Sequence, residues 1–286
     1  MRDSTKLREY IDGEQALVIP GVYDGLSARL VERAGFQVVY ASGGAIARSS
    51  GVPDMGLLGL PEVVARLEQI VDSVTLPVIA DCDTGYGNAL NAQRAIRAFE
   101  RAGVAGLHLE DQTFPKRCGH LDDKGVVPTG EFVQKIRAAR DASQDPDLVI
   151  IARTDALAVE GLDSALERMH AYMEAGADVA FVEAPVSEEQ IREIAERLPY
   201  PKLINMFDGG KTPLVPLDTL SRLGYRLILV PSDLQRAAIK AMDEVARVIR
   251  RDGNSAAVAE ALISFEDRER IIDTPAYLEL SRRFGA

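Results

Sequence analysis

Eight short apolar runs, separated by segments with helical periodicity, constrain the fold of this chain more than any other feature. Each run is rich in Val, Ile, Leu and Ala, is too short for a typical helix, and lacks the alternating pattern of a half-exposed strand. Such runs are typical of parallel strands that are buried on both faces. We therefore predict strands within 16–22, 38–43, 77–83, 106–111, 148–155, 179–184, 202–207 and 227–231.

The segments between these runs predict helices. In 91–103, apolar residues at helical intervals form one stripe, and a glycine ends the segment. The segment 162–176 repeats this pattern, and 61–74 opens with the proline and the acidic residue that often start a helix. Strands that alternate with helices are joined by right-handed crossovers, and eight of them most economically close into a (β/α)8 barrel of the TIM type. An open doubly wound sheet is the alternative.

We expect a single domain over residues 1–286, because no linker rich in Pro, Gly or Ser interrupts the pattern. Barrels of about 200–250 residues routinely form one domain. From about Ala241 to the C-terminus the sequence continues as an amphipathic helical extension, which follows the part of the chain that forms the barrel. An apolar stripe on such an extension favours packing on a neighbouring helix or subunit.

Charge and composition exclude several classes of partner. The chain has 33 Lys and Arg against 44 Asp and Glu, and its net charge of −11 repels nucleic-acid phosphates and anionic membranes. No segment approaches the ~20 apolar residues of a membrane span, and the N-terminal residues do not resemble a signal peptide. The two cysteines cannot form a disulfide framework, and free thiols suit a reducing compartment. We therefore expect a cytoplasmic protein that binds neither nucleic acid nor membrane.

Polar or ionisable groups stand at the C-terminal ends of nearly all the predicted strands, where the active sites of β/α barrels lie. Buried strands have no structural need for so many charges, because an unpaired buried charge is strongly unfavourable. A shared site would explain these groups. They are Tyr40, Ser42, Asp81, Asp83, Glu110, Asp111, Arg153, Asp155, Glu183 and Asn205, and Gly43 and Gly44 follow Ser42 at the end of the second strand.

Three of these acids predict a metal site. Asp81 and Asp83 stand two residues apart, so on a strand their side chains share a face and point into the barrel mouth. Two like charges this close need a cation, and Glu110 on the next strand adds a third carboxylate. An all-oxygen set suits Mg²⁺, with Mn²⁺ as an alternative ion, whereas zinc would prefer His and Cys ligands. In the competing interpretation, these acids cap helices or pair with Arg and Lys.

The segment Lys116–His120, which reads KRCGH, follows the fourth predicted strand closely and could close over the metal. Its cationic residues would favour the thiolate of Cys118, and a thiol tuned in this way transfers protons at neutral pH. An incidental loop cysteine is the alternative. His108 and His170 lie inside a predicted strand and a predicted helix, where structural roles are commoner, and Cys82 is expected in the core.

Four motifs resemble the isocitrate lyase and phosphoenolpyruvate mutase superfamily, over roughly Ile19 to Arg236. They are YASGGAIARSSGVPD from Tyr40, DCDTGYGN from Asp81, LHLEDQTFPKRCGH from Leu107 and IARTDALAVEGLD from Ile151. The KRCGH segment is similar to that of the lyases in this superfamily, whereas the enzymes that act on phosphonates differ there. The resemblance therefore implies a carbon–carbon lyase.

The resemblance also implies binding roles. The metal ligands would be Asp81 directly and, mostly through water, Asp83, Glu110 and Asp54. The 2-hydroxy carboxylate of the substrate would be bound by Ser42, Gly43 and Gly44. The leaving end of the substrate and the loop that covers it would involve Lys116, Arg117, Gly119, His120, Glu183, Asn205 and Arg236.

Three residues would carry out a retro-aldol cleavage. By the resemblance, Tyr40 would remove the 2-hydroxyl proton, Arg153 would steady the developing pyruvate enolate, and Cys118 would protonate the departing carbon. The implied substrate is 2,3-dimethylmalate or 2-methylisocitrate, and the products are pyruvate plus propionate or succinate. Methylisocitrate lyases use an extra C-terminal arginine, but Phe265 stands at that position, which favours a dicarboxylate bearing a methyl group.

The superfamily exchanges its eighth helix between subunits, so the resemblance implies a homotetramer with a swapped helix. Two other enzymatic interpretations stay open: an oxaloacetate hydrolase, and a mutase or hydrolase of the phosphonopyruvate type. A third is a non-catalytic barrel that binds a metabolite. The products formed from a panel of small di- and tricarboxylates discriminate among them.

Overall fold

A closed barrel of eight parallel strands forms the body of the protein in the computed structural model, which describes residues 1–119 and 123–285. Each strand pairs with the next one along the chain, and the last pairs with the first. The predicted (β/α)8 barrel is confirmed, and the open sheet is excluded. The strands are β1 (Leu17–Val22), β2 (Val39–Ala41), β3 (Val78–Asp81), β4 (Gly106–Glu110), β5 (Val149–Thr154), β6 (Val179–Val182), β7 (Lys202–Asn205) and β8 (Tyr225–Val230).

Burial on both faces explains why the strands read as continuous apolar runs. On β5, Val149 and Ile151 point into the barrel interior, whereas Ile150 between them packs outward against the helices. All three are fully buried. Successive side chains of a strand face opposite ways, so a strand with two covered faces needs apolar residues at every position.

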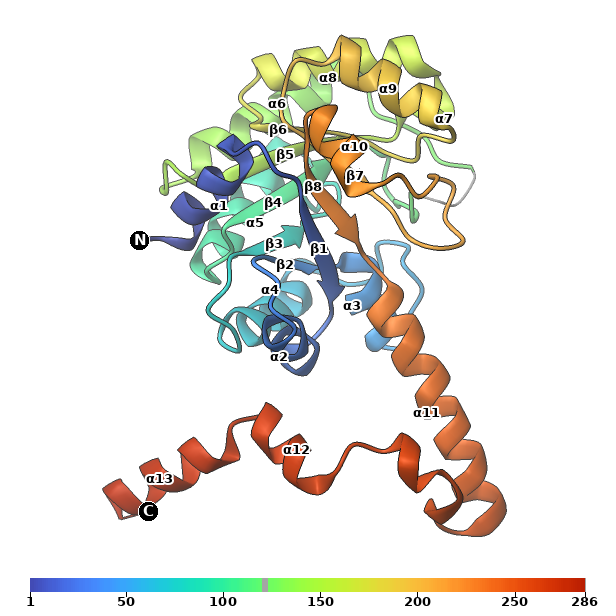
Figure 1. The fold of residues 1–286 in the computed structure, drawn as a ribbon. Helices are drawn as coiled ribbons and strands as arrows, with labels where there is room; N and C mark the ends of the chain where they lie inside the picture. The colour runs from blue at the N-terminus through green and yellow to red at the C-terminus, as the bar shows by residue number, and fades with distance from the viewer. Residues whose placement is uncertain (120–122, 286) are drawn as a thin grey trace.

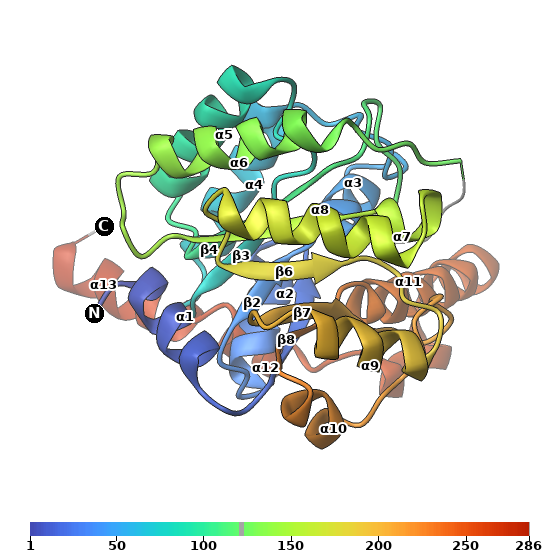
Figure 2. The same cartoon turned by 90° about the horizontal axis from the view of Figure 1, so that it is seen from above.

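Helices surround the barrel (Figures 1 and 2). One of them, α1 at the N-terminus, lies in a polar segment that was not predicted as a helix; it closes the N-terminal end of the barrel with Leu7, which is fully buried. The helices up to β8 are α1 (Asp3–Asp12), α2 (Gly25–Arg33), α3 (Gly43–Ser49), α4 (Leu60–Val71), α5 (Ala89–Arg101), α6 (Thr129–Ala142), α7 (Ala156–Val159), α8 (Leu162–Glu174), α9 (Glu188–Arg197) and α10 (Leu217–Arg222).

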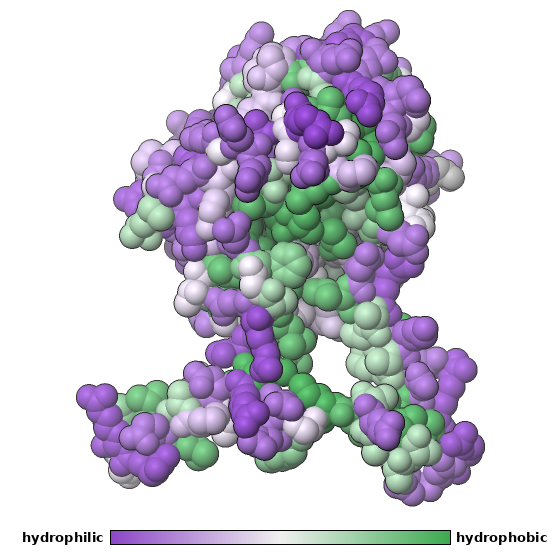
Figure 3. Space-filling model, in the orientation of Figure 1, coloured by the Kyte–Doolittle hydropathy of each residue, from purple (hydrophilic) through white to green (hydrophobic). Residues whose placement is uncertain are grey.

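The C-terminal helices do not cover the barrel in the same way. The helix α11 (Asp233–Asp252) begins directly after β8 and projects away from the barrel (Figure 1). A short 3-10 helix (Ala256–Ala261), α12 (Phe265–Ile271) and α13 (Thr274–Phe284) follow it, and α12 contacts α2. Figure 3 shows apolar residues gathered over β1 and β8, on the face that none of the described helices crosses in Figure 1.

The described helices include none that is both long enough and apolar enough to cross a membrane.

Candidate functional site

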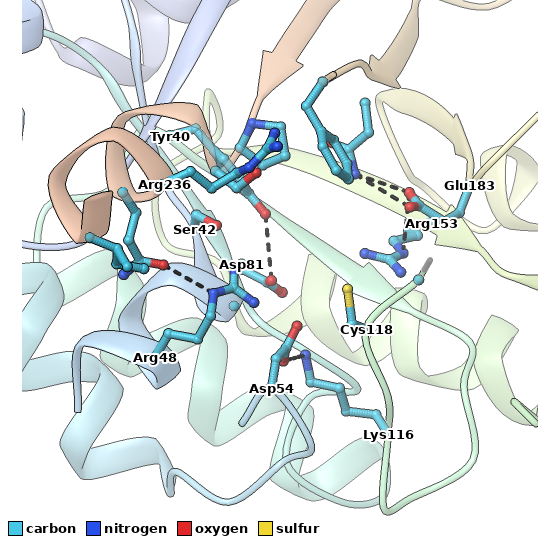
Figure 4. Close-up of a pocket in the computed structure, with 18 residues that line it drawn as sticks. Tyr40, Ser42, Arg48, Asp54, Asp81, Lys116, Cys118, Arg153, Glu183 and Arg236 are labelled. Carbon is cyan, nitrogen blue, oxygen red and sulfur yellow. Dashed lines mark hydrogen bonds and ion pairs between the residues drawn. The ribbon is translucent and has the colours of Figure 1, made fainter. Parts of the chain in front are cut away.

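A cavity of about 300 Å³ opens at the C-terminal end of the barrel and brings most of the predicted site residues together (Figure 4). Gly43, Asp83, Glu110 and Arg117 do not line this cavity, and His120 lies outside the described residues. The predicted residues that line it are Tyr40, Ser42, Gly44, Asp54, Asp81, Lys116, Cys118, Gly119, Arg153, Glu183, Asn205 and Arg236.

Two glycines let carboxylates approach the start of α3. A Cβ atom on Gly43 would stand 2.5 Å from Oδ2 of Asp81, and one on Gly44 would stand 2.8 Å from Oδ2 of Asp54. Both separations are too short for real atoms, so a side chain at either position would push a predicted metal ligand aside. Ser42 precedes these glycines as the N-cap of α3, and its hydroxyl accepts a hydrogen bond from the backbone N–H of Ala45 at 3.4 Å.

A lysine lies between two of the predicted metal ligands. Lys116 Nζ is 2.5 Å from Oδ1 of Asp54 and 2.6 Å from Oδ1 of Asp83. Burial raises the pKa of Asp83 to about 6, although the Lys116 charge opposes this shift. The strand β3 ends at Asp81, and Asp83 adopts a left-handed backbone with φ 47°. A turn, rather than the strand alternation that we expected, therefore places Asp83.

Glu110 is the clearest sign that the site takes a cation. It is fully buried, and among the described residues neither of its carboxylate oxygens has a hydrogen-bond partner; Nη1 of Arg153 lies 3.4 Å from it. Burial raises the pKa of Glu110 well above its usual range, although Arg153 acts in the opposite direction. A divalent ion and its waters would satisfy this carboxylate.

The acids by themselves do not enclose an ion. Across residues 1–119 and 123–285, no three His, Cys, Asp or Glu side chains are grouped closely enough to hold a metal. Mg²⁺ requires only one or two carboxylates and keeps several of its waters. The residues present therefore fit a hydrated magnesium ion beside Asp81, and the ligand set stays a prediction.

Arg153 is held by acids on three sides. Its Nε donates to Oδ2 of Asp155 at 2.9 Å, and Glu110 and Glu183 lie within 3.4 and 3.9 Å of its guanidinium. Burial opposes ionisation of Asp155, but Arg153 and Lys124 outweigh it and lower the pKa of Asp155 to about 2. Lys124, which the sequence did not indicate, reaches Oδ1 of Asp155 at 2.7 Å and also donates to the Gly119 carbonyl.

Tyr40 does not stand alone, because its hydroxyl contacts a histidine. The Oη of Tyr40 lies 2.8 Å from Nε2 of His108, and Nδ1 of His108 lies 3.7 Å from Oδ1 of Asp81. Burial, and then the charge of Asp81, raise the pKa of Tyr40 well above its usual value. Burial also lowers the pKa of His108, although Asp81 opposes that shift.

His108 is therefore part of the site and does not serve only the core. The sequence did contain a signal for it: His108 stands two residues before Glu110 on β4, so both side chains point to the same face of the strand. His170 instead lies on α8, outside the cavity, where its Nδ1 is 3.4 Å from the hydroxyl of Tyr200. Cys82 is fully buried in the core, as predicted.

The loop after β4 places a thiol in the cavity. Figure 4 shows the sulfur of Cys118 facing the space between Asp81 and Arg153. The loop lies tightly against the site, because a Cβ on Gly119 would collide with Arg153 and Glu183. Arg117 points elsewhere: its side chain is 40% exposed and lies 3.5 Å from Asp123.

The far wall of the cavity comes from β6, β7 and α11. Nδ2 of Asn205 donates to Oε2 of Glu183 at 3.1 Å, and Nη1 of Arg236 donates to the Asp208 carbonyl at 2.6 Å. Sequence reasoning missed six other residues that line the cavity, whereas Phe265 on α12 does not line it. The missed residues are Arg48, Phe207, Pro231, Ser232, Gln235 and Ile239.

Two curated relatives match nearly the whole chain. The 2,3-dimethylmalate lyase of Eubacterium barkeri is 43% identical over 286 residues, which are 100% of this chain and 99% of that protein. The 2-methylisocitrate lyase of Bacillus subtilis (strain 168) is 40% identical over 274 residues, which are 96% of this chain and 89% of that protein.

Fold comparison agrees with these relatives. The trigonal crystal structure of 2,3-dimethylmalate lyase, described as a PEP mutase/isocitrate lyase superfamily member, has a TM-score of 0.93 at 37% identity and covers 100% of this chain and 96% of that chain. The family described as phosphoenolpyruvate phosphomutase matches residues 7–250. The chain therefore belongs to the PEP mutase/isocitrate lyase superfamily.

Proposed function

We propose that this protein is a metal-dependent carbon–carbon lyase that cleaves 2,3-dimethylmalate to pyruvate and propionate. 2-Methylisocitrate, which would yield pyruvate and succinate, is the second candidate substrate. One observation carries the proposal: the thiol of Cys118 faces the same cavity as Tyr40, Asp81 and Arg153. A proton acceptor and a proton donor on opposite sides of one cavity suit the two proton transfers of a retro-aldol cleavage. The names of the two relatives support the same reaction.

We propose Mg²⁺ as the resident metal, with Mn²⁺ able to replace it. Asp81 would hold the ion directly, and Asp83, Glu110 and Asp54 would bind its waters. When bound, the metal supplies a Lewis acid that lowers the pKa of the substrate hydroxyl and steadies negative charge on oxygen. The orphaned oxygens of Glu110 support this assignment.

The first proton transfer falls to Tyr40. Its hydroxyl oxygen takes the 2-hydroxyl proton while its own proton passes to Nε2 of His108, which lies 2.8 Å away. The electron pair of the O–H bond becomes the carbonyl of pyruvate as the bond between carbons 2 and 3 breaks. Arg153 steadies the charge on the 2-oxygen before this bond breaks.

The second proton transfer falls to Cys118. The electron pair of the broken bond remains on carbon 3, so the negative charge belongs to the leaving acid. Pyruvate departs as the ketone, which corrects the pyruvate enolate that we expected from the sequence. The S–H of Cys118 donates its proton to carbon 3 and completes propionate or succinate.

Product analysis tests this function. Purified protein with Mg²⁺ is incubated with a panel of acids of four to seven carbons, and the products are identified by NMR. Pyruvate plus propionate from 2,3-dimethylmalate is the expected outcome. Acetate plus oxalate from oxaloacetate would identify a hydrolase instead, and a product of P–C bond chemistry would identify the phosphonate branch. Binding without turnover of any acid would identify a non-catalytic barrel.

A pair of cysteine variants tests the proton donor. Cys118→Ser is expected to lower kcat by about 10²–10⁴-fold while Mg²⁺ still binds, because general acid catalysis contributes about this much. Cys82→Ala, at a buried thiol outside the cavity, is the matched control and should retain activity. Unchanged turnover in Cys118→Ser would remove this residue from the mechanism.

We further propose that the protein is a homotetramer in which α11 packs on a second copy. The helix exposes Ile239, Met242 and Ile249, and α2 exposes Leu26 and Leu30. Apolar residues also gather over β1 and β8 (Figure 3). Apolar surface of this extent favours a protein partner. Light scattering on the full chain should give four times 31.1 kDa, and Met242→Glu should lower that mass. A monomer at micromolar concentration would contradict the proposal.

A further inference from the structure

Arg48 reaches the cavity from the last turn of α3, the helix that starts at the Ser42–Gly44 segment. Gly44 and Arg48 are four residues apart and therefore lie on one face of the helix. The two terminal nitrogens of Arg48 lie 3.2 and 3.3 Å from where a Cβ on Gly44 would stand. The absence of a side chain at Gly44 thus makes room for the guanidinium as well as for Asp54.

Gln235 holds this guanidinium in place. Its Nε2 donates to the Ala45 carbonyl at 2.8 Å, and its Oε1 accepts a hydrogen bond from Nε of Arg48 at 3.0 Å (Figure 4). Gln235 is only 5% exposed, so its amide is fixed by these two contacts. The terminal nitrogens of Arg48 stay available to a ligand in the cavity.

Among the described residues, no acid pairs with the charge of Arg48. Lys116 pairs with two aspartates, Arg153 lies among three acids, and Arg236 lies 3.2 Å from Asp233. Over the described ranges of the chain, Arg48 has no carboxylate within 4.0 Å, and its fixed partner is a neutral amide. A guanidinium in this state offers a forked pair of N–H donors that matches a carboxylate.

We propose that Arg48, oriented by Gln235, binds the 2-hydroxy or 2-oxo carboxylate of the ligand; this rests on the proposed lyase function. Its place beside Gly44 puts it at the end of the cavity opposite Glu183 (Figure 4). This carboxylate is common to 2,3-dimethylmalate, 2-methylisocitrate and pyruvate. Arg48 therefore sets affinity for all of them and does not choose between di- and tricarboxylates.

Binding of oxalate in the presence of Mg²⁺, measured by calorimetry, tests the proposal without any turnover. Oxalate presents two adjacent carboxylates and resembles a 2-oxo acid. Arg48→Met should weaken its affinity by roughly 10- to 100-fold, because a hydrogen bond to a charged group contributes about that factor. Arg48→Lys should bind oxalate more tightly than Arg48→Met but more weakly than the wild type, since an ammonium group lacks the paired N–H donors of a guanidinium. Arg101→Met, at an exposed arginine of α5 far from the cavity, should change nothing.

Gln235→Glu tests whether Arg48 binds the ligand or only links α3 to α11 through its hydrogen bond with Gln235. A glutamate would pair with Arg48 and neutralise it, so oxalate binding should weaken even though the arginine is present. If Arg48 only links the two helices, the new ion pair should strengthen that link and leave the affinity for oxalate unchanged. That result would overturn the proposal. Unchanged affinity in Arg48→Met, or no oxalate binding by the wild type, would also overturn it.

Kinetics distinguish this proposal from the proposed function. If the wild type cleaves 2,3-dimethylmalate, Arg48→Met should raise KM with little change in kcat, because the contact is made in both ground and transition states. A wild type that cleaves no acid in the panel defeats the lyase assignment, whereas the oxalate series still decides the role of Arg48.

Discussion

The two ends of the barrel use charged groups in opposite ways. At the N-terminal end, Arg8 and Arg140 both pair with Asp178, and both donate to the carbonyl of Leu148. Asp178 also accepts the backbone N–H of Ile150 at 2.8 Å. At the C-terminal end, the two buried oxygens of Glu110 accept no hydrogen bond from any residue within 1–119 and 123–285.

This difference separates charges that stabilise the fold from charges that serve a ligand. A buried charge with a full set of partners costs little, whereas one without partners lowers stability. Functional sites often retain such unfavourable arrangements because activity requires them. Removing a charge at the N-terminal end of the barrel should therefore lower stability. Removing one at the C-terminal end, the mouth where the cavity opens, should lower activity.

The largest effect is expected for Asp81→Asn at the mouth. Loss of the direct metal ligand should lower kcat by on the order of 10³-fold, because metal stabilisation of charge is worth several kcal/mol. Calorimetry should show weaker Mg²⁺ binding, while the unfolding midpoint stays near that of the wild type. Asp72→Asn, an exposed acid after α4, is the control. Full activity in Asp81→Asn would contradict the assignment of this ligand.

Glu110→Gln tests whether an acid at the C-terminal end of the barrel serves activity without adding to stability. Groups that act through the outer shell of a metal contribute about 10–100-fold, and we expect a loss of that size in activity. The free energy of unfolding, measured with urea in the absence of metal, should stay the same or rise because a neutral amide replaces a buried carboxyl group that makes no hydrogen bond with the described residues. A clear loss of stability would mean that Glu110 behaves like the acids at the other end of the barrel.

Asp178→Ala should show the reverse behaviour. It leaves two partly buried arginines and one backbone N–H without their partner, so we expect a loss of about 2–3 kcal/mol in unfolding free energy. The kcat of the folded fraction should not change. Asp163→Ala, which removes an exposed pair with Arg197, should stay within about 0.5 kcal/mol of the wild type. Equal effects in the two variants would contradict the comparison.

The last expected effect depends on pH and concerns Lys202, at the start of β7. Burial, and then the charge of Arg226, lower the pKa of Lys202 to about 8, against about 10.4 for an unfolded lysine. Between these values the unfolded chain binds more protons, so this residue should make stability rise with pH from about 8 to 10.4. Lys202→Met should flatten that rise in urea titrations. An identical pH profile would show that Lys202 does not titrate there.

Much of the fold could be predicted from the sequence, because strands buried on both faces leave continuous apolar runs. The same reasoning located Asp81, Glu110 and Arg153 at strand ends. It missed α1, since its apolar residues are few and its composition is polar. It also misjudged how Asp83 is placed, because a left-handed turn rather than a strand decides its position.

Local pattern therefore determined the strands, the helices and the acids at the mouth, since these depend on neighbours within a few residues. Only the tertiary structure decided which side chains share a hydrogen bond across the barrel. Arg48 and Gln235 are 187 residues apart, and Tyr40 and His108 are 68 apart. Nothing near any of these residues encodes its partner, because closure of the barrel is what turns Tyr40 on β2 and His108 on β4 into one interior and brings α11 back beside α3.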